Sequence, residues 1–396
     1  TWNSVIFSGV PHNGLYEPIL ERGSYTDGNV PGNGGPGGDE ATKDDDNWNL
    51  LGNPYPSGLD ADAFLFENAS TNDRIDGVIY LWNHGLQIRR GNSPFFGDYG
   101  LSYDEADYIA YNYLGSTVNG FNGVVGSGQG FFVLMEDTYG TASGNSFVGT
   151  ATFNNSMRIG DDESFFRMAN PSGNRNTDIE PSRIWLGLVQ PSEKVSTILL
   201  GYAEGATNAK DKMYDAGLMS GSSRKIYSII DDNDNKFVIQ GRAMPFDDSD
   251  EIHIGVVIDE QGSYAINIEE VDGLFANEEQ NIYVEDTYNN FIHDLRLSPY
   301  FFNSEAGDFN DRFIIKYTNN SLGIEEFNAD TGLTIQAPNN SYIKVKSGNS
   351  PIDSVIVYDL LGRTLIDKNN INESEFSVET LNYADGAYIV KAVLVD

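Results

Sequence analysis

The chain contains few residues that are arranged for catalysis. Its histidines, which could act as general bases or metal ligands, are His12, His84, His253 and His293. They are far apart and show no metal-binding spacing such as H-E-x-x-H. No G-x-S-x-G motif occurs, and a chain without Cys has no thiol nucleophile. With 59 acidic residues, paired carboxylates arise by chance. We therefore predict no enzymatic activity for this part of the protein.

One acidic stretch has the spacing of a calcium loop. Asp231, Asn233 and Asn235 place oxygen ligands at alternate positions. However, Lys236 stands where such a loop needs Gly, and no bidentate Glu follows six residues later. A metal-free hairpin turn explains the stretch equally well. Structural Ca²⁺ is thus the one cofactor that the sequence suggests, with 44–46 (three Asp) as a second weak candidate.

Aromatic side chains are the candidates for ligand binding. Tyr99, Tyr103, Tyr108 and Tyr111 lie in one stretch, and Trp82 ends an apolar run before it. In an exposed row, these rings would stack on sugars; in a β-sandwich core, they would fill space with their hydroxyls at the rim. The sequence leaves both interpretations open.

The charge and composition exclude several classes of protein. The net charge of −35 reflects 59 acidic against 24 basic residues, and nucleic-acid binding needs clustered cations instead. No run approaches the ~20 apolar residues of a transmembrane helix. Aromatic residues make up 12% of the chain, and 42 glycines punctuate it. This composition favours an all-β extracellular protein.

Alternating apolar and polar residues predict short antiparallel strands along the whole chain. We expect tandem antiparallel β-sandwich units: a β-rich region at 1–150, a sandwich at 151–322 and a small immunoglobulin-like domain at 323–396. Arg242 should form an ion pair with Asp247 or Asp248. One short helix is expected at 59–68. The expected strands include 48–52, 78–82, 130–135, 183–189, 197–202, 225–230, 236–240, 252–258, 263–269, 281–285, 312–317, 342–346, 353–358, 375–378 and 387–395.

The order of motifs in the tail resembles a known family. The matching segments are Leu322-Gly323-Ile324-Glu325-Glu326, Ala337-Pro338-Asn339-Asn340-Ser341, Val357-Tyr358-Asp359-Leu360-Leu361-Gly362-Arg363 and Gly386-Ala387-Tyr388-Ile389-Val390. They resemble the type A C-terminal sorting domain of proteins exported by the type IX secretion system of Bacteroidota. Asn340 replaces a proline of that family, and the family continues beyond the position of Asp396 into a basic strand. We therefore expect one strand of that family to be missing from this chain.

The resemblance implies a secreted, cell-surface protein. Its tail would be bound by the type IX outer-membrane translocon and its shuttle barrel protein. Recognition would involve Gly362, Arg363, Gly386 and Tyr388 on the surface of the tail.

The preceding part of the chain also has familiar motifs. Asn53-Pro54-Tyr55-Pro56, Arg183-Ile184-Trp185-Leu186 and Asn310-Asp311-Arg312-Phe313 look like a region that recurs before the sorting domain in Flavobacteria-like surface proteins. The resemblance implies a structural protein or adhesin, with a surface glycan or a second copy as partner. The alternative is the carbohydrate-binding part of a secreted polysaccharide-processing enzyme whose catalytic domain lies upstream.

Overall fold

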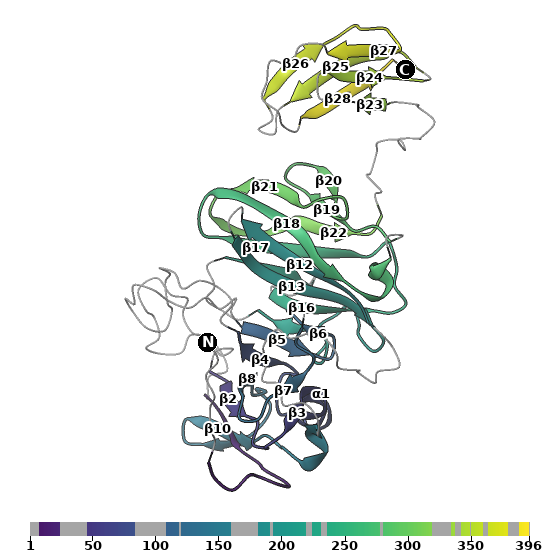
Figure 1. Cartoon of the computed structure of the whole chain (residues 1–396). Coiled ribbons are helices and arrows are strands. Elements are labelled where there is room, and N and C mark those ends of the chain that lie inside the picture. Colours follow the sequence, from purple (N-terminus) through teal and green to yellow (C-terminus); the bar gives the residue numbers. More distant parts are fainter. Residues whose placement is uncertain are drawn as a thin grey trace. The chain divides into compact units, whose positions relative to one another are not determined.

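The computed structural model describes most of the chain in two compact units (Figure 1). Unit 1 is Thr1–Asn319 and unit 2 is Asn320–Asp396. Residue 150, an expected domain boundary, lies inside unit 1. The described residues are 8–23, 46–83, 108–118, 120–159, 181–190, 193–218, 224–230, 236–277, 280–318, 334–336, 342–348, 350–358, 363–378 and 388–395.

Strands dominate both units, so the expected all-β class is confirmed. The helical elements among the described residues are α1 (Ala61–Leu65), η2 (Phe66–Thr71), η4 (Asn155–Met157) and η5 (Gly273–Ala276). The first two form the helix expected at 59–68. It begins after Asp60, whose carboxylate accepts a hydrogen bond from the N–H of Ala63 at 3.1 Å and so caps the helix. None of these helices is long and apolar enough to cross a membrane.

The first lobe of unit 1 (residues 8–159) is built on a five-stranded antiparallel sheet in the order β2-β8-β4-β5-β6. Two smaller sheets, β1-β10-β9 and β11-β3-β7, complete it. One face of the large sheet buries Leu51, Phe131 and Tyr111 in a core that includes Phe64 of α1. The strands are β1 (Ile19–Gly23), β2 (Trp48–Gly52), β3 (Gly58–Asp60), β4 (Ile79–Trp82), β5 (Tyr108–Asn112), β6 (Gly115–Ser116), β7 (Val124–Val125), β8 (Gly130–Leu134), β9 (Thr141–Ser143), β10 (Ser146–Thr150) and β11 (Arg158–Ile159).

The second lobe (residues 181–318) is one eleven-stranded, strongly curved sheet in the order β20-β19-β22-β17-β15-β16-β13-β12-β18-β21, with β14 also paired to β16 (Figure 1). Its core contains Ile184, Leu186, Ile254 and Phe313. The strands are β12 (Ser182–Gln190), β13 (Glu193–Ala203), β14 (Ala216–Gly217), β15 (Lys225–Ile229), β16 (Lys236–Ala243), β17 (Glu251–Ile258), β18 (Gly262–Val271), β19 (Tyr283–Asp286), β20 (Phe291–Asp294), β21 (Tyr300–Ser304) and β22 (Gly307–Lys316).

This lobe contains every strand expected from the sequence between 183 and 317, and adds β14, β20 and β21. It departs from a purely antiparallel sandwich at one point. β13 and β16 pair in parallel, with Leu199 opposite Ile239. The expectation of antiparallel pairing throughout was therefore wrong at this point, because the chain crosses over between these strands instead of turning back directly.

The two lobes of unit 1 share a hydrophobic cluster. Tyr80 and Leu114 from the first lobe pack with Trp185 and Leu199 from the second. The indole N–H of Trp185 donates to the carbonyl of Ser116 at 2.9 Å. Apolar burial and a buried hydrogen bond thus hold the lobes together.

Unit 2 is a small sandwich of two three-stranded antiparallel sheets, β23-β24-β27 and β26-β25-β28. Val345 from the first sheet and Val355 and Val357 from the second belong to one core. All four strands expected in the tail are present, together with β23 and β26. The strands are β23 (Thr334–Gln336), β24 (Ile343–Lys346), β25 (Ile352–Tyr358), β26 (Thr364–Lys368), β27 (Glu375–Val378) and β28 (Ile389–Leu394).

Candidate functional site

Among the predicted ligand residues that the structure describes, Trp82 is exposed and Tyr108 is partly exposed. They face each other on β4 and β5, with ring centroids 4.9 Å apart in an edge-to-face arrangement. Tyr108 meets Phe132 of β8 in the same way, at 5.8 Å. Trp82 is 39% exposed. Because these rings meet edge to face, they do not form a flat platform, and a ligand would meet mainly the exposed part of Trp82.

Tyr111 cannot contact a ligand, which corrects its assignment as a ligand residue. It is 0% exposed, its ring lies 5.0 Å from that of Phe121, and its hydroxyl donates to Asp62 at 2.8 Å. Side chains alternate along β5, so Tyr111 points into the core and Tyr108 points to the other face. Tyr99 and Tyr103 lie outside the described residues.

The predicted calcium ligands Asp231, Asn233 and Asn235 also lie outside the described residues, as do positions 44 and 45. The strands that flank 231–235 pair antiparallel, with Ile229 opposite Lys236. That stretch therefore connects the strands of a hairpin. Within the ranges that the structure describes, no three His, Asp or Glu side chains gather as metal ligands would. Calcium binding stays a prediction.

Arg242 forms an ion pair, but with a different aspartate from those expected. Its Nε donates to Asp250 at 2.9 Å, and a second guanidinium nitrogen contacts the same carboxylate. The hydroxyl of Tyr202 also donates to Asp250, at 2.7 Å. Asp247 instead accepts from the N–H and hydroxyl of Ser249. The turn that follows β16 thus directs Asp250 toward Arg242, and the expected pairing was wrong.

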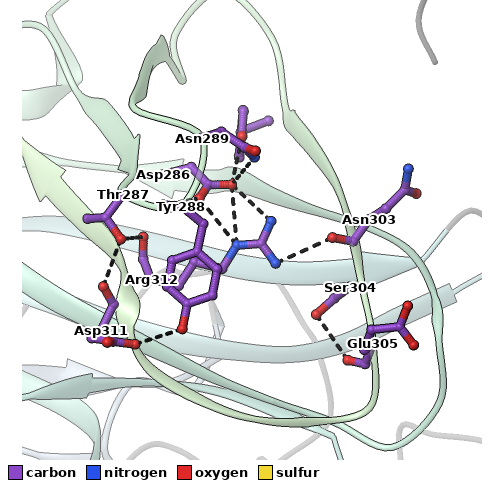
Figure 2. Close-up of polar contacts among 10 residues, drawn as sticks. Asp286, Thr287, Tyr288, Asn289, Asn303, Ser304, Glu305, Asp311 and Arg312 are labelled. Atoms are coloured by element: carbon purple, nitrogen blue, oxygen red, sulfur yellow. Dashed lines mark hydrogen bonds and ion pairs between the residues drawn. The ribbon is translucent and has the colours of Figure 1, made fainter. Parts of the chain in front are cut away.

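Figure 2 shows Asp286, Asn289 and Arg312 in an extensive polar cluster of the second lobe. Together with Tyr300, which also contacts Asp286, we call them the Asp286 cluster. Asp286 ends β19 and is 0% exposed. Its carboxylate accepts from Arg312 Nη2 at 2.9 Å, the Tyr300 hydroxyl at 2.9 Å and Asn289 Nδ2 at 2.8 Å. The N–H of Tyr288 donates as well, at 3.1 Å. A buried carboxylate needs such donors to offset the loss of water.

Arg312, on β22, is enclosed by aromatic rings. Its guanidinium carbon lies 4.8 Å from the ring centre of Phe302, 4.9 Å from that of Phe313 and 5.4 Å from that of Tyr288. Nη1 donates to the carbonyl of Asn303 at 3.3 Å. Cation–π contacts and one ion pair therefore stabilise a charge that is almost fully buried.

The Asp286 cluster joins the two ends of the eleven-stranded sheet. Asp286 and Arg312 belong to β19 and β22 near one end, whereas Tyr300 and Asn303 belong to β21 at the other. Burial raises the pKa of Tyr300 to about 12, so its hydroxyl keeps the proton that it donates at neutral pH. The donors and acceptors of this cluster bind one another, which fits a role in closing the sheet.

Among the described carboxyl groups of unit 1, burial raises the pKa of Asp76 and that of Asp215 to about 7. Such shifts often mark functional sites. In this fold, Asp215 accepts from the N–H of Gly241 at 2.8 Å and also binds the N–H of Asp211, so it orders the loop before β14. Asp76 lies in the turn before β4, where its carboxylate accepts from the N–H of Val78 at 3.3 Å. Both groups therefore have structural partners.

Two of the four predicted recognition residues in unit 2 are described. Arg363 is exposed and immediately precedes β26. Tyr388 immediately precedes β28 and is partly buried against the core of the unit. Gly362 and Gly386 lie outside the described residues. The recognition surface stays a prediction.

Comparison with known proteins places both units in families without an assigned function. Residues 322–396 match the family described as "Domain of unknown function (DUF8694)". No curated protein and no solved structure matches the chain. Residues 1–317 match a second family over most of the chain's length. By this match, the chain belongs to the family described as "Domain of unknown function (DUF8693)".

Proposed function

We propose that this chain is a structural or adhesive protein of the cell surface, exported by the type IX secretion system through unit 2. The observation that carries the proposal is that Asn320–Asp396 is a compact unit with a hydrophobic core of its own. A sorting domain has to be bound on unrelated cargo proteins, so it must fold without help from the cargo. The ordered tail motifs of the sequence support the same interpretation.

The proposed role of unit 1 is to extend from the surface or to adhere, without catalysis. The Asp286 cluster supports this role, because Asp286 and Arg312 direct hydrogen bonds to each other and to β21. The proposed partners of the whole protein are the translocon, the shuttle barrel protein, and a surface glycan or a second copy.

Export of a fusion protein tests the proposal. Residues 320–396 are fused to a foreign folded domain in a host with a type IX system. The fusion should reach the cell surface, and Gly386→Val should retain it in the periplasm. Lys368→Val, an exposed position of β26, is the matched control and should be exported. If the fusion remains periplasmic while the full chain is exported, unit 2 is only a structural domain.

A second candidate function is glycan binding, for which the partial exposure of Trp82 (39%) is the specific observation. An aromatic ring at the surface can stack on a sugar face. Affinity electrophoresis in gels that contain polysaccharide should show retarded migration, which Trp82→Ala abolishes. Phe291→Ala, another half-exposed aromatic side chain but in the second lobe, should leave migration unchanged. Equal migration of Trp82→Ala and the parent protein would rule out this surface.

A further inference from the structure

β28 of unit 2 is an edge strand whose outer face is apolar except for Lys391. It ends the order β26-β25-β28, and among the described residues no strand pairs with its other side. Ile389 is 54% exposed, Val393 is 40% exposed and Val395 is 37% exposed. Alternation along β28 and into Val395 places these three side chains on the same face, and the exposed Lys391 lies on that face between Ile389 and Val393. A largely apolar edge of this kind is a site for pairing with another strand.

The outward backbone groups of this edge can be assigned. The N–H of Val395 donates to the carbonyl of Pro351, next to β25, at 2.8 Å. Because alternate residues of a strand direct their N–H and C=O groups to the same side, those of Val390, Ala392 and Leu394 point away from β25. They form a row of donors and acceptors that an added strand would use.

The charges of β28 and of the whole chain restrict which kind of segment can pair with this edge. The stretch from 387 to 395 contains no acidic residue and only one charge, Lys391, although the whole chain has 59 acidic residues and a net charge of −35. Edge strands are usually blunted by charged side chains, proline or bulges. Two copies of a chain with this charge repel each other, which disfavours self-pairing, whereas a segment without acidic residues is not repelled.

We infer that β28 is a docking site for an extended segment of another protein, free of acidic residues, that adds to the sheet as a strand. Main-chain hydrogen bonds to Val390, Ala392 and Leu394 supply affinity. Side chains of the added strand lie beside Ile389 and Val393 and cover them. This is β-strand addition, in which backbone bonds give affinity and alternate side chains give specificity.

The test uses the full chain and a labelled peptide of about eight alternating valines and threonines, the length of a typical strand, with a lysine at each end. Fluorescence anisotropy should show saturable binding. Ala392→Pro removes one outward N–H but no bond to β25, and should weaken binding by about tenfold or more. Val393→Lys places a charge on the outer face and should weaken it similarly. Thr364→Lys, an exposed position on the other edge strand, should bind like the parent.

Charge and self-pairing are tested separately. The same peptide with glutamate at each end should bind more weakly than the lysine form, and added salt should reduce the difference. Circular dichroism of each variant checks that unit 2 remains folded. The inference is overturned if the peptide shows no saturable binding, or if both edge variants bind it as tightly as the parent. It is also overturned if sedimentation shows a dimer that the Val393→Lys substitution dissociates. The last result would make a second copy the occupant.

Discussion

Removing Arg312 should destabilise unit 1 far more than removing a surface cation. Arg312→Met keeps an apolar stem among Phe302 and Phe313 but leaves the carboxylate of Asp286, which is 0% exposed, without its counter-charge. Breaking one partner of a buried pair costs about 3–5 kcal/mol. The carboxylate keeps neutral donors from Tyr300 and Asn289, which places the expected loss near the lower end, about 3 kcal/mol.

Urea unfolding followed by tryptophan fluorescence measures this loss in unit 1 alone. All four tryptophans lie between residues 1 and 319, so unit 2 does not contribute. The matched control is Lys194→Ala, which removes an exposed ion pair with Glu269 and should cost no more than about 1 kcal/mol. Arg312→Lys keeps the charge but loses the planar fork, and should cost about 1–2 kcal/mol.

A double mutant separates the ion pair from simple packing. Asp286→Asn combined with Arg312→Met leaves no unpaired charge, so it should be more stable than the sum of the single changes predicts, by about 1–3 kcal/mol. Two results would contradict this expectation: a cost for Arg312→Met no larger than that of Lys194→Ala, or additive effects in the double mutant. Either would mean that the pair does not hold the ends of the sheet.

Three further predictions concern other parts of the chain. Burial raises the pKa of Asp76 to about 7, so folded unit 1 binds an extra proton between about pH 4 and pH 7 and loses stability as pH rises through this window. Asp76→Asn should therefore become more stable relative to the parent across the window, by at most about 4 kcal/mol in urea titrations. Gly77 has φ +90°, and a Cβ there would lie 2.1 Å from the carbonyl oxygen of Lys212. Gly77→Ala should cost about 1–3 kcal/mol, whereas Gly217→Ala, with open space around it, should cost less in the same assay. If 231–235 binds calcium, the melting midpoint should be higher in calcium than in chelator, and equal midpoints would exclude a stabilising calcium ion.

The alternation of apolar and polar residues predicted the strands well, because a half-buried strand has apolar residues on its buried face and polar residues on its exposed face. In β17, Ile252 and Ile254 are buried while His253 between them is only partly buried, and the sequence shows this alternation directly. β21 breaks the rule, since Tyr300, Phe301 and Phe302 are consecutive aromatics with no alternation in residue type. Its alternation exists in burial alone, and burial is a property of the folded sheet.

Which strands pair, and which aspartate binds Arg242, could not be predicted, because both depend on the three-dimensional arrangement of the folded chain. The parallel pairing of β13 with β16 brings Leu199 opposite Ile239. Nothing in either run distinguishes a parallel neighbour from an antiparallel one. Similarly, Arg242 had three aspartates within reach along the chain. The turn geometry gave Asp247 to Ser249 and Asp250 to Arg242.

The Asp286 cluster joins the two ends of the eleven-stranded sheet, and the sequence alone did not predict this contact. The curved sheet brings β21 close to β22, and among the described residues no backbone ladder joins these two strands. A side chain makes the contact instead: Arg312 Nη1 donates to the carbonyl of Asn303, as a neighbouring strand's N–H would. A guanidinium suits this task, because its remaining donors can bind a carboxylate in the same plane. That carboxylate must then come from a third strand, which is the position of Asp286. Asn303, Arg312 and Asp286 each lie in a segment whose sequence shows no unusual pattern. Their contact depends on the closed sheet, so no local sequence pattern predicts it.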